Sequence, residues 1–185
     1  MQKNTAYAPG DGETTPSSKE TALTPIQILA VALAYMTDAD KVRDPAERAE
    51  LLVVFGKMVS RGELSEDGLG ELIQFAFDRA ETIPIDDFLE DATHALAPLQ
   101  KVAIYINALD LMLADGRVVE SEQGLLKKMQ TAFGIEQDTV RAIREVLFLK
   151  NDTSMFLHPE HPRNALGAEL HVAYGLPSPA HGPSA

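Results

Sequence analysis

The sequence predicts an all-α fold, and three observations support it. Apolar residues recur with helical spacing over nearly all of residues 25–150, and no window alternates apolar and polar residues as a strand would. Proline, glycine and serine interrupt this pattern where helices would begin and end. One helical segment also repeats itself along the chain. We therefore expect a bundle of about seven helices.

The first two predicted helices have the clearest signals. The first covers residues 25–38 and is apolar on almost every side, so we expect it at the centre of the bundle. The second begins at Pro45, with Asp44 as N-cap and Glu47 completing a capping box, and it ends near Gly62. The residues of the second helix that we expect to face inward are Leu51, Leu52, Val54, Phe55 and Met58.

Five further helices follow from the same start and stop signals. A serine or a proline marks the beginning of several of them, and a glycine follows the sixth. They are predicted to begin near Ser65, Ile85, Pro98, Glu120 and Gln137. The seventh helix is expected to turn Val140, Ile143, Val146, Leu147 and Leu149 inward.

Length and composition indicate one domain between two tails. A chain of 185 residues that is 45% hydrophobic can bury a core of its own. Residues 1–23 are rich in threonine, serine, proline and glycine, and residues 152–185 are rich in proline, so we expect both to be mostly disordered. The helical domain is then expected over residues 24–151.

Charge and cysteine content exclude several classes of protein. The net charge of −12 argues against nucleic-acid binding and suits cations, basic partners or simple solubility. The absence of cysteine excludes disulfides, thiolate metal sites and a cysteine nucleophile. The N-terminal residues have no apolar core like that of a signal peptide, and the longest apolar run, residues 28–36, is shorter than the roughly 20 residues that span a bilayer. We expect a cytoplasmic protein without membrane insertion.

One internal repeat carries most of the functional information. At a constant offset of 75 residues, Asp40 falls on Asp115 and Glu47 falls on Glu122. Each copy consists of an apolar helix, a tight turn opened by Ala-Asp, and a second helix with acids in its first turn. Two such copies would pack most simply about an approximate twofold axis, with the first and fifth helices paired at the centre.

The repeated carboxylates are candidate metal ligands. The twofold arrangement could bring four of them together, and carboxylates held close must be solvated, partly protonated or bound to a cation. Oxygen ligands favour calcium, magnesium or manganese, with zinc less natural. The proposed ligands are Asp40, Glu47, Asp115 and Glu122, and the outer candidates are Asp38, Asp44 and Glu120.

Helix capping explains the same residues without a metal. Residues 44–47 form a good capping box, and Glu120 and Glu122 would interact favourably with the dipole at a helix N-terminus. The two interpretations are compatible, because a carboxylate can cap a helix and also coordinate an ion. Both stay open at this point.

Known catalytic and calcium-binding signatures are absent from the sequence. Counting from Asp38, an EF-hand would need glycine where Arg43 stands and glutamate where Ala49 stands. There is no nucleophile elbow, phosphate-binding loop, dinucleotide fingerprint or His-Glu-x-x-His motif. We therefore expect a protein that is not an enzyme.

Two smaller groups of residues are given no functional role by the sequence. His158 and His161 lie among prolines, and we take them as incidental to a tail. Four cations of the last two helices are too few for a nucleic-acid site and are expected to complete solvated faces. These cations are Lys127, Lys128, Arg141 and Arg144.

The stretch from Ala108 to Glu122, followed by Phe-Gly-Ile at residues 133–135, resembles the TerB (tellurite-resistance) family. Residues 36–48 resemble the first half of that family, and the resemblance covers roughly residues 25–150. It implies a seven-helix, pseudo-symmetric fold whose acidic positions fall on the four proposed ligands. Lys41 departs from the pattern, since the second copy has Gly116 there, and a lysine beside the acids could weaken a cation site in the first half.

The family resemblance also implies a role. Related domains occur in tellurite and chemical-stress operons and at the front of membrane-anchored DnaJ-like co-chaperones, and they are thought to act by metal binding and protein association without catalysis. We expect a stress-response accessory protein that binds divalent cations weakly and docks to protein partners, including membrane-associated ones. The alternative is a pure protein-interaction module with no metal site. The sequence leaves the oligomeric state open.

Overall fold

The computed structural model describes residues 22–39, 45–114 and 119–165. In these ranges the regular secondary structure consists of helices, with no strand. The predicted all-α class is confirmed, with seven helices of 11 residues or more. The main helices are α1 (Pro25–Thr37), α2 (Pro45–Ser60), α3 (Glu66–Thr82), α4 (Ile85–Ala95), α5 (Pro98–Ala114), α6 (Glu120–Phe133) and α7 (Gln137–Asn151). The twofold relation between the two halves stays a prediction.

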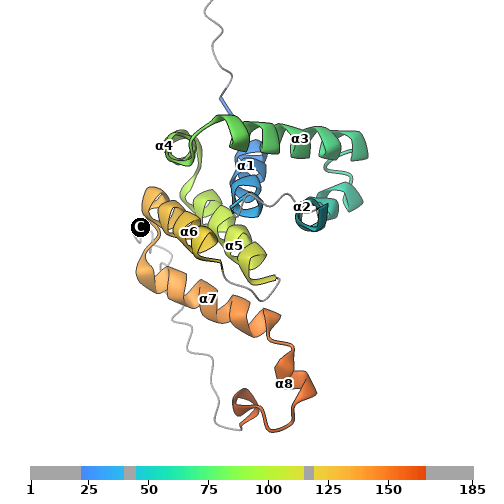
Figure 1. Cartoon of the computed structure of the whole chain (residues 1–185), viewed down its shortest axis with the longest axis vertical. Coiled ribbons are helices and arrows are strands. Elements are labelled where there is room, and N and C mark those ends of the chain that lie inside the picture. Colours follow the sequence, from blue (N-terminus) through green and yellow to red (C-terminus); the bar gives the residue numbers. More distant parts are fainter. Residues whose placement is uncertain (1–21, 40–44, 115–118, 166–185) are drawn as a thin grey trace, which may run out of the picture.

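The helices are arranged around α1. In Figure 1, α3 and α4 lie across one end of the molecule, α5 and α6 occupy its middle, and α7 leads away to the far end. Helix α1 lies within the body and contacts α2, α3, α4, α5 and α6. The apolar first helix is therefore central, as its sequence predicts.

Local signals fix where α1 begins. The Thr24 hydroxyl accepts a hydrogen bond from the Gln27 amide at 3.4 Å, and the Gln27 side chain accepts one from the Thr24 amide at 2.9 Å. Pro25 occupies the first helical position, where the missing N–H has no helical partner to lose. This capping box satisfies backbone groups that the first turn leaves unpaired.

The second half of α1 is buried on every side. All eight residues from 30 to 37 are at most 9% exposed. Three of them are alanines, whose small side chains let neighbouring backbones approach closely. The only polar side chain in this stretch apart from the Tyr35 hydroxyl is Thr37, which donates to the Ala34 carbonyl at 3.0 Å and so remains satisfied in the core.

A tyrosine joins α1 to the connection between α3 and α4. The Tyr35 hydroxyl donates to the Ile83 carbonyl at 2.6 Å, and its ring packs against Phe88 with centroids 5.3 Å apart. Burial raises the pKa of Tyr35 to about 12, an effect that the Arg79 charge partly opposes. Ile83 and Pro84 end one helix and begin the next, so this bond holds a bend of the chain against the core.

A carboxylate joins α5 to the end of α7. Asp110 accepts a hydrogen bond from the Asn151 amide at 3.0 Å and forms an ion pair with Lys150. At the start of α7, the chain leaves α6 through Gly134, whose φ of 65° lies in the left-handed region that favours glycine. Helix α7 is thus fixed at both ends.

Two residues expected to face inward are exposed. Leu52 is 47% exposed and Val146 is 40% exposed, so these two assignments were wrong. Each follows or precedes a buried residue, Leu51 or Leu147, and successive residues on a helix point about 100° apart. Because α2 and α7 lie at the periphery and are covered on one side, only one residue of each adjacent apolar pair is buried.

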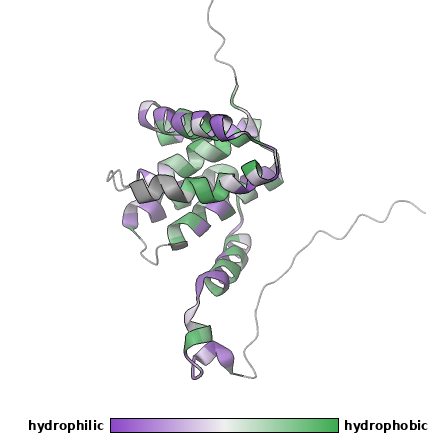
Figure 2. Ribbon diagram, turned by 90° about the vertical axis from the view of Figure 1, so that its right-hand side faces the viewer, coloured by the Kyte–Doolittle hydropathy of each residue, from purple (hydrophilic) through white to green (hydrophobic). Residues whose placement is uncertain are grey.

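The described part of the chain continues beyond α7. A short helix, α8 (Ser154–Leu157), and a 3-10 turn, η1 (Pro162–Asn164), lie within the segment expected to be mostly disordered. Figure 2 shows α8 and η1 apart from the main group of helices. Most of the hydrophobic segments lie in that main group. None of the helices described is both long enough and apolar enough to cross a membrane.

The Tyr35 hydrogen bond gives a first prediction. Replacing Tyr35 with phenylalanine leaves the Ile83 carbonyl without its donor and should lower the free energy of unfolding by about 1 kcal/mol, or the Tm by about 4 °C. The pKa of Tyr35 is raised from 10.0 to about 12 in the folded state. Its hydroxyl therefore contributes fully to the free energy of unfolding below pH 10, and this contribution is lost as the pH rises through 12.

Urea denaturation of both proteins at pH 7 and between pH 10 and 12 measures the two effects. The difference in stability between wild type and Tyr35→Phe should shrink across the alkaline window. An unchanged difference there would show that the hydroxyl is not held in its neutral form.

Candidate functional site

The two acidic turns lie between α1 and α2 and between α5 and α6. Helix α1 ends at Thr37 with Asp38 as its C-cap, and α5 ends at Ala114. Helices α2 and α6 begin at Pro45 and Glu120, which are 75 residues apart, the offset of the sequence repeat. The second helix of each copy therefore begins where the repeat predicts, whereas the first helices end 77 residues apart, at residues 37 and 114.

The candidate ligands divide between described and undescribed residues. Asp40, Asp44 and Asp115 lie outside the described residues, so their predicted roles are not decided by the geometry. Glu47 belongs to the first turn of α2, but its side chain is also outside the described part. Glu122 is described in full, as are the outer candidates Asp38 and Glu120.

Glu122 caps the start of α6. It is the third residue of the helix and is partly buried, and its Oε2 accepts a hydrogen bond from the Val119 amide at 3.2 Å. Valine has no side-chain acceptor, so the reciprocal half of a capping box is absent. The capping role expected for this residue is therefore present, and a metal-binding role stays a prediction.

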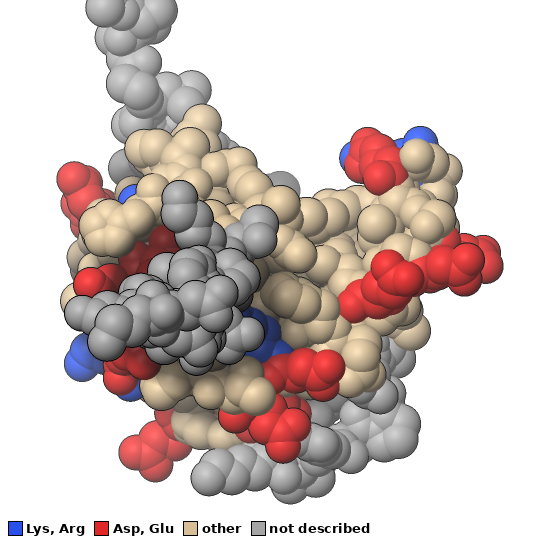
Figure 3. Space-filling model, turned by 90° about the horizontal axis from the view of Figure 1, so that it is seen from above, with Lys and Arg blue, Asp and Glu red and all other residues tan. Residues whose placement is uncertain are grey.

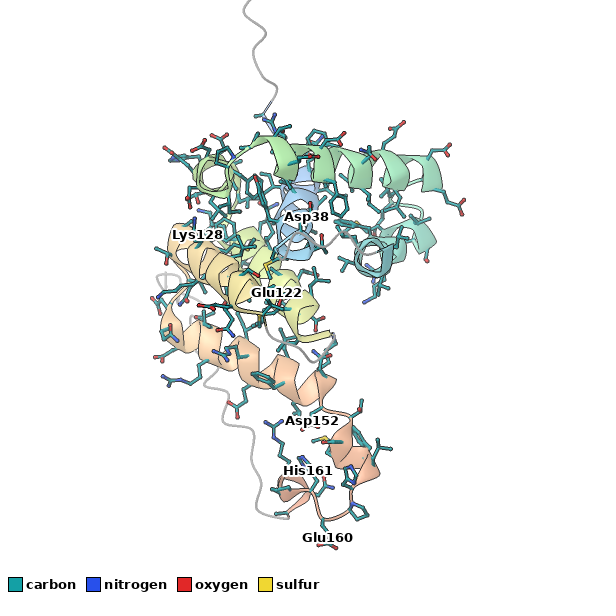
Figure 4. The ribbon with its side chains drawn as sticks, viewed as in Figure 1. Asp38, Glu122, Lys128, Asp152, Glu160 and His161 are labelled. Atoms are coloured by element: carbon teal, nitrogen blue, oxygen red, sulfur yellow. The ribbon has the colours of Figure 1, made fainter. Side chains whose placement is uncertain are left out.

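Asp38 lies on a helix that touches α6. Its amide donates to the Ala34 carbonyl at 3.0 Å and closes the last turn of α1, while its carboxylate is partly exposed. Figure 4 shows Asp38 and Glu122 on the sides of α1 and α6 near the middle of the molecule. Among the described side chains, no group of three or more histidine, aspartate or glutamate residues converges as metal ligands would.

A groove between α4 and α6 was not predicted from the sequence. It has a volume of about 610 Å³, with Leu89 on one wall and Ala132 on the other. Lys128 of α6 donates to both carboxylate oxygens of Asp86 in α4 at 2.8 Å and so ties the two walls together. The signal lay in the helical spacing of residues 86, 89, 90, 93 and 94, which place one stripe of α4 against α6.

A cluster of polar residues around Asp152 stabilises the segment after α7. Asp152 accepts hydrogen bonds from the Ser154 hydroxyl and amide and lies 3.6 Å from His161 and 3.7 Å from Arg163. The Ser154 hydroxyl and amide, helped by these cations, lower the pKa of Asp152 below its usual value.

A further hydrogen bond closes this segment: Asn164 donates to the Met155 carbonyl at 2.8 Å. His161 is therefore built into a local structure, visible in Figure 4, although the sequence indicated an incidental tail residue.

Acidic side chains are prominent on the face formed by α3 and α4. Figure 3 shows aspartate and glutamate spread around the rim of the face formed by α3 and α4, with few lysines or arginines among them. Helices α3 and α4 each carry two acids in the first turn, where the helix dipole favours negative charge. Part of the acidic surface is thus explained by helix stability alone.

The fold defines a class of protein: an all-α domain in which the apolar helices α1 and α5 are each followed by a connection rich in acidic residues. The sequence profile of the family described as Tellurite resistance protein TerB matches residues 27–145, which include both turns. The chain belongs to this family. Comparison with curated proteins gave no match, and comparison with solved structures gave none either.

The geometry of Glu122 gives a second prediction. Glu122→Ala removes the acceptor of the Val119 amide and should lower the free energy of unfolding by about 1 kcal/mol, whereas Glu122→Gln keeps an acceptor and should retain most of the stability. Urea denaturation without added metal measures both variants. Equal losses in the two variants would mean that the negative charge, rather than the hydrogen bond, stabilises α6.

Proposed function

We propose that this protein is an accessory protein of the stress response linked to tellurite resistance, which binds divalent cations weakly through its acidic turns and docks to protein partners. The family match carries the proposal, because it spans both turns and the helices that flank them. The protein is not an enzyme in this proposal, and it acts in the cytoplasm.

The cation site is proposed to consist of Asp40, Glu47, Asp115 and Glu122. All four are oxygen donors, which suit calcium, magnesium or manganese better than zinc. Glu122 supports the proposal because its capping bond fixes the carboxylate at the edge of the second turn. The turn of the second half is the stronger candidate, since the first carries Lys41 where the second has Gly116.

Partner docking is supported by the surface. The groove between α4 and α6 offers apolar walls with charged residues at its edges, as protein-binding grooves do. A net charge of −12 favours encounter with basic partners over nucleic acid or anionic lipid. Membrane-associated proteins are included among the proposed partners. A protein can bind such a partner at the membrane surface without having a membrane-spanning helix of its own.

Cation binding is tested by thermal melting of the full chain after treatment with EDTA. Magnesium, calcium, manganese and zinc are added separately at millimolar concentration. A cation that binds only the folded protein adds RT ln(1 + [L]/Kd) to its stability, so the Tm should rise and saturate for at least one oxygen-preferring ion. The double variant Asp115→Asn with Glu122→Gln should abolish that rise while leaving the helical content unchanged.

The matched control is Glu71→Gln with Asp91→Asn. It removes the same amount of negative charge from exposed positions of α3 and α4, away from both turns. The control should keep the full cation response, because only general screening is reduced. A response lost equally in both double variants would contradict a specific site at the turns.

One observation favours the alternative, a protein-interaction module without a metal site. Phe156 and Leu157 are 84% and 72% exposed and are adjacent residues of α8. The polar cluster around Asp152 lies at the start of this helix. Adjacent exposed apolar side chains on an ordered segment are typical of a contact surface. If no cation raises the Tm of the wild-type protein, the acids act as caps and the alternative holds.

A further inference from the structure

A second concave site lies between α6 and α7. Helix α5 forms its floor and the two other helices form its walls, and the cleft has a volume of about 340 Å³, within the range of small-molecule sites. It is separate from the proposed docking groove, which lies between α4 and α6. Lys127 borders both and therefore cannot distinguish them.

The interior of the cleft is apolar. Its floor and inner walls consist of side chains that are at most 6% exposed, so little water reaches them. These side chains are Leu109, Met112, Leu126 and Val140. An occupant would need an apolar body to replace the water that stands over this surface.

One polar group of the cleft has no hydrogen-bond partner among the described residues. Tyr105 is 4% exposed and lines the cleft, yet its hydroxyl makes no hydrogen bond with any described residue. Although the ring is buried, the hydroxyl itself is not sealed from solvent, so it opens onto the water in the cleft. By contrast, Tyr35, the other tyrosine in the described chain, donates to the Ile83 carbonyl. The hydroxyl of Tyr105 is thus a donor available to a ligand.

A cation stands near this hydroxyl. Arg144 lines the cleft from α7 and stacks over the Phe148 ring at 5.7 Å, and it forms no ion pair with the described carboxylates. Burial raises the pKa of Tyr105, and the Arg144 charge acts on the same hydroxyl in the opposite direction. A neutral donor and a guanidinium therefore converge on one cleft, which is the pair of groups that binds a carboxylate.

The rim of the cleft carries no acid among the residues that the structure describes. The protein contains 28 aspartate and glutamate residues, and none of the described ones lines this site. The remaining polar lining consists of Lys127 and glutamines, and the Gln130 amide donates to the Gln137 side chain at 3.0 Å across the two walls. In a chain this acidic, an opening lined by cations and glutamines repels an organic anion less than a surface lined by carboxylates does.

We propose that the cleft between α6 and α7 binds a small organic carboxylate with an apolar body, whose charged group meets Tyr105 and Arg144 and whose body lies on Leu109 and Val140. This site shares no residue with the proposed cation site at the acidic turns. It gives the domain a second ligand of opposite charge, held by other residues.

The test uses sodium octanoate as the probe and octan-1-ol as its uncharged counterpart. Isothermal titration of the full chain should give one binding event for octanoate, with octan-1-ol binding at least about tenfold more weakly because it lacks the charge-assisted bonds. Octanoate should also shift amide resonances of α5, α6 and α7 in two-dimensional NMR. Equal affinity for the two probes, or no octanoate binding, would overturn the proposal.

Three variants locate the site. Tyr105→Phe removes only the hydroxyl and Arg144→Gln removes only the charge, and each should weaken octanoate binding about tenfold. Arg141→Gln is the matched control, because Arg141 lies one turn earlier on α7, pairs with Asp138 and does not line the cleft. Its affinity should stay within about twofold of wild type. If Arg141→Gln and Arg144→Gln weaken binding equally, the site is not this cleft.

Discussion

Five helices pack against α1, and this arrangement requires a helix that has no polar stripe. From residue 30 to residue 37 every side chain of α1 is buried, so each neighbour meets an apolar or small surface. The two polar atoms that this region does carry, on Tyr35 and Thr37, are satisfied by carbonyls at Ile83 and Ala34. Burial of α1 from all sides fixes where α3 and α5 run, since these two helices make its most extensive contacts.

The helix boundaries could be predicted because they are encoded locally. Pro25, Ser65, Pro98 and Gly134 mark beginnings and ends through fixed φ angles, capping bonds and the left-handed conformation, none of which needs tertiary contacts. Burial was harder to predict. An apolar residue such as Leu52 faces inward only if a neighbouring helix covers that side, and coverage is a property of the whole fold.

The candidate sites differ in the same way. The acidic turns could be found from the sequence, because the acids of each copy lie close together along the chain and the same pattern recurs 75 residues later. Tyr105 and Arg144 could not, since they come from different helices and each is unremarkable alone. A tyrosine in an apolar helix suggests core packing, and an arginine on an exposed face suggests solvation. Tyr105 and Arg144 are identified as a candidate anion-binding pair only by the structure, in which the tyrosine hydroxyl lacks a described hydrogen-bond partner and both side chains line one cleft.

Electrostatics connects the two proposed sites. Helix α6 carries Glu122, a proposed cation ligand, in its first turn, and the next residue, Gln123, lines the cleft. A cation at the turn would lower the negative potential of this half of the protein, and so would reduce the repulsion that an organic anion meets on approach. Coupling of this kind is reciprocal: whatever factor the cation contributes to anion affinity, the anion contributes to cation affinity. If both sites bind as proposed, the domain would respond to two ligands of opposite charge through this electrostatic coupling, without any change of fold.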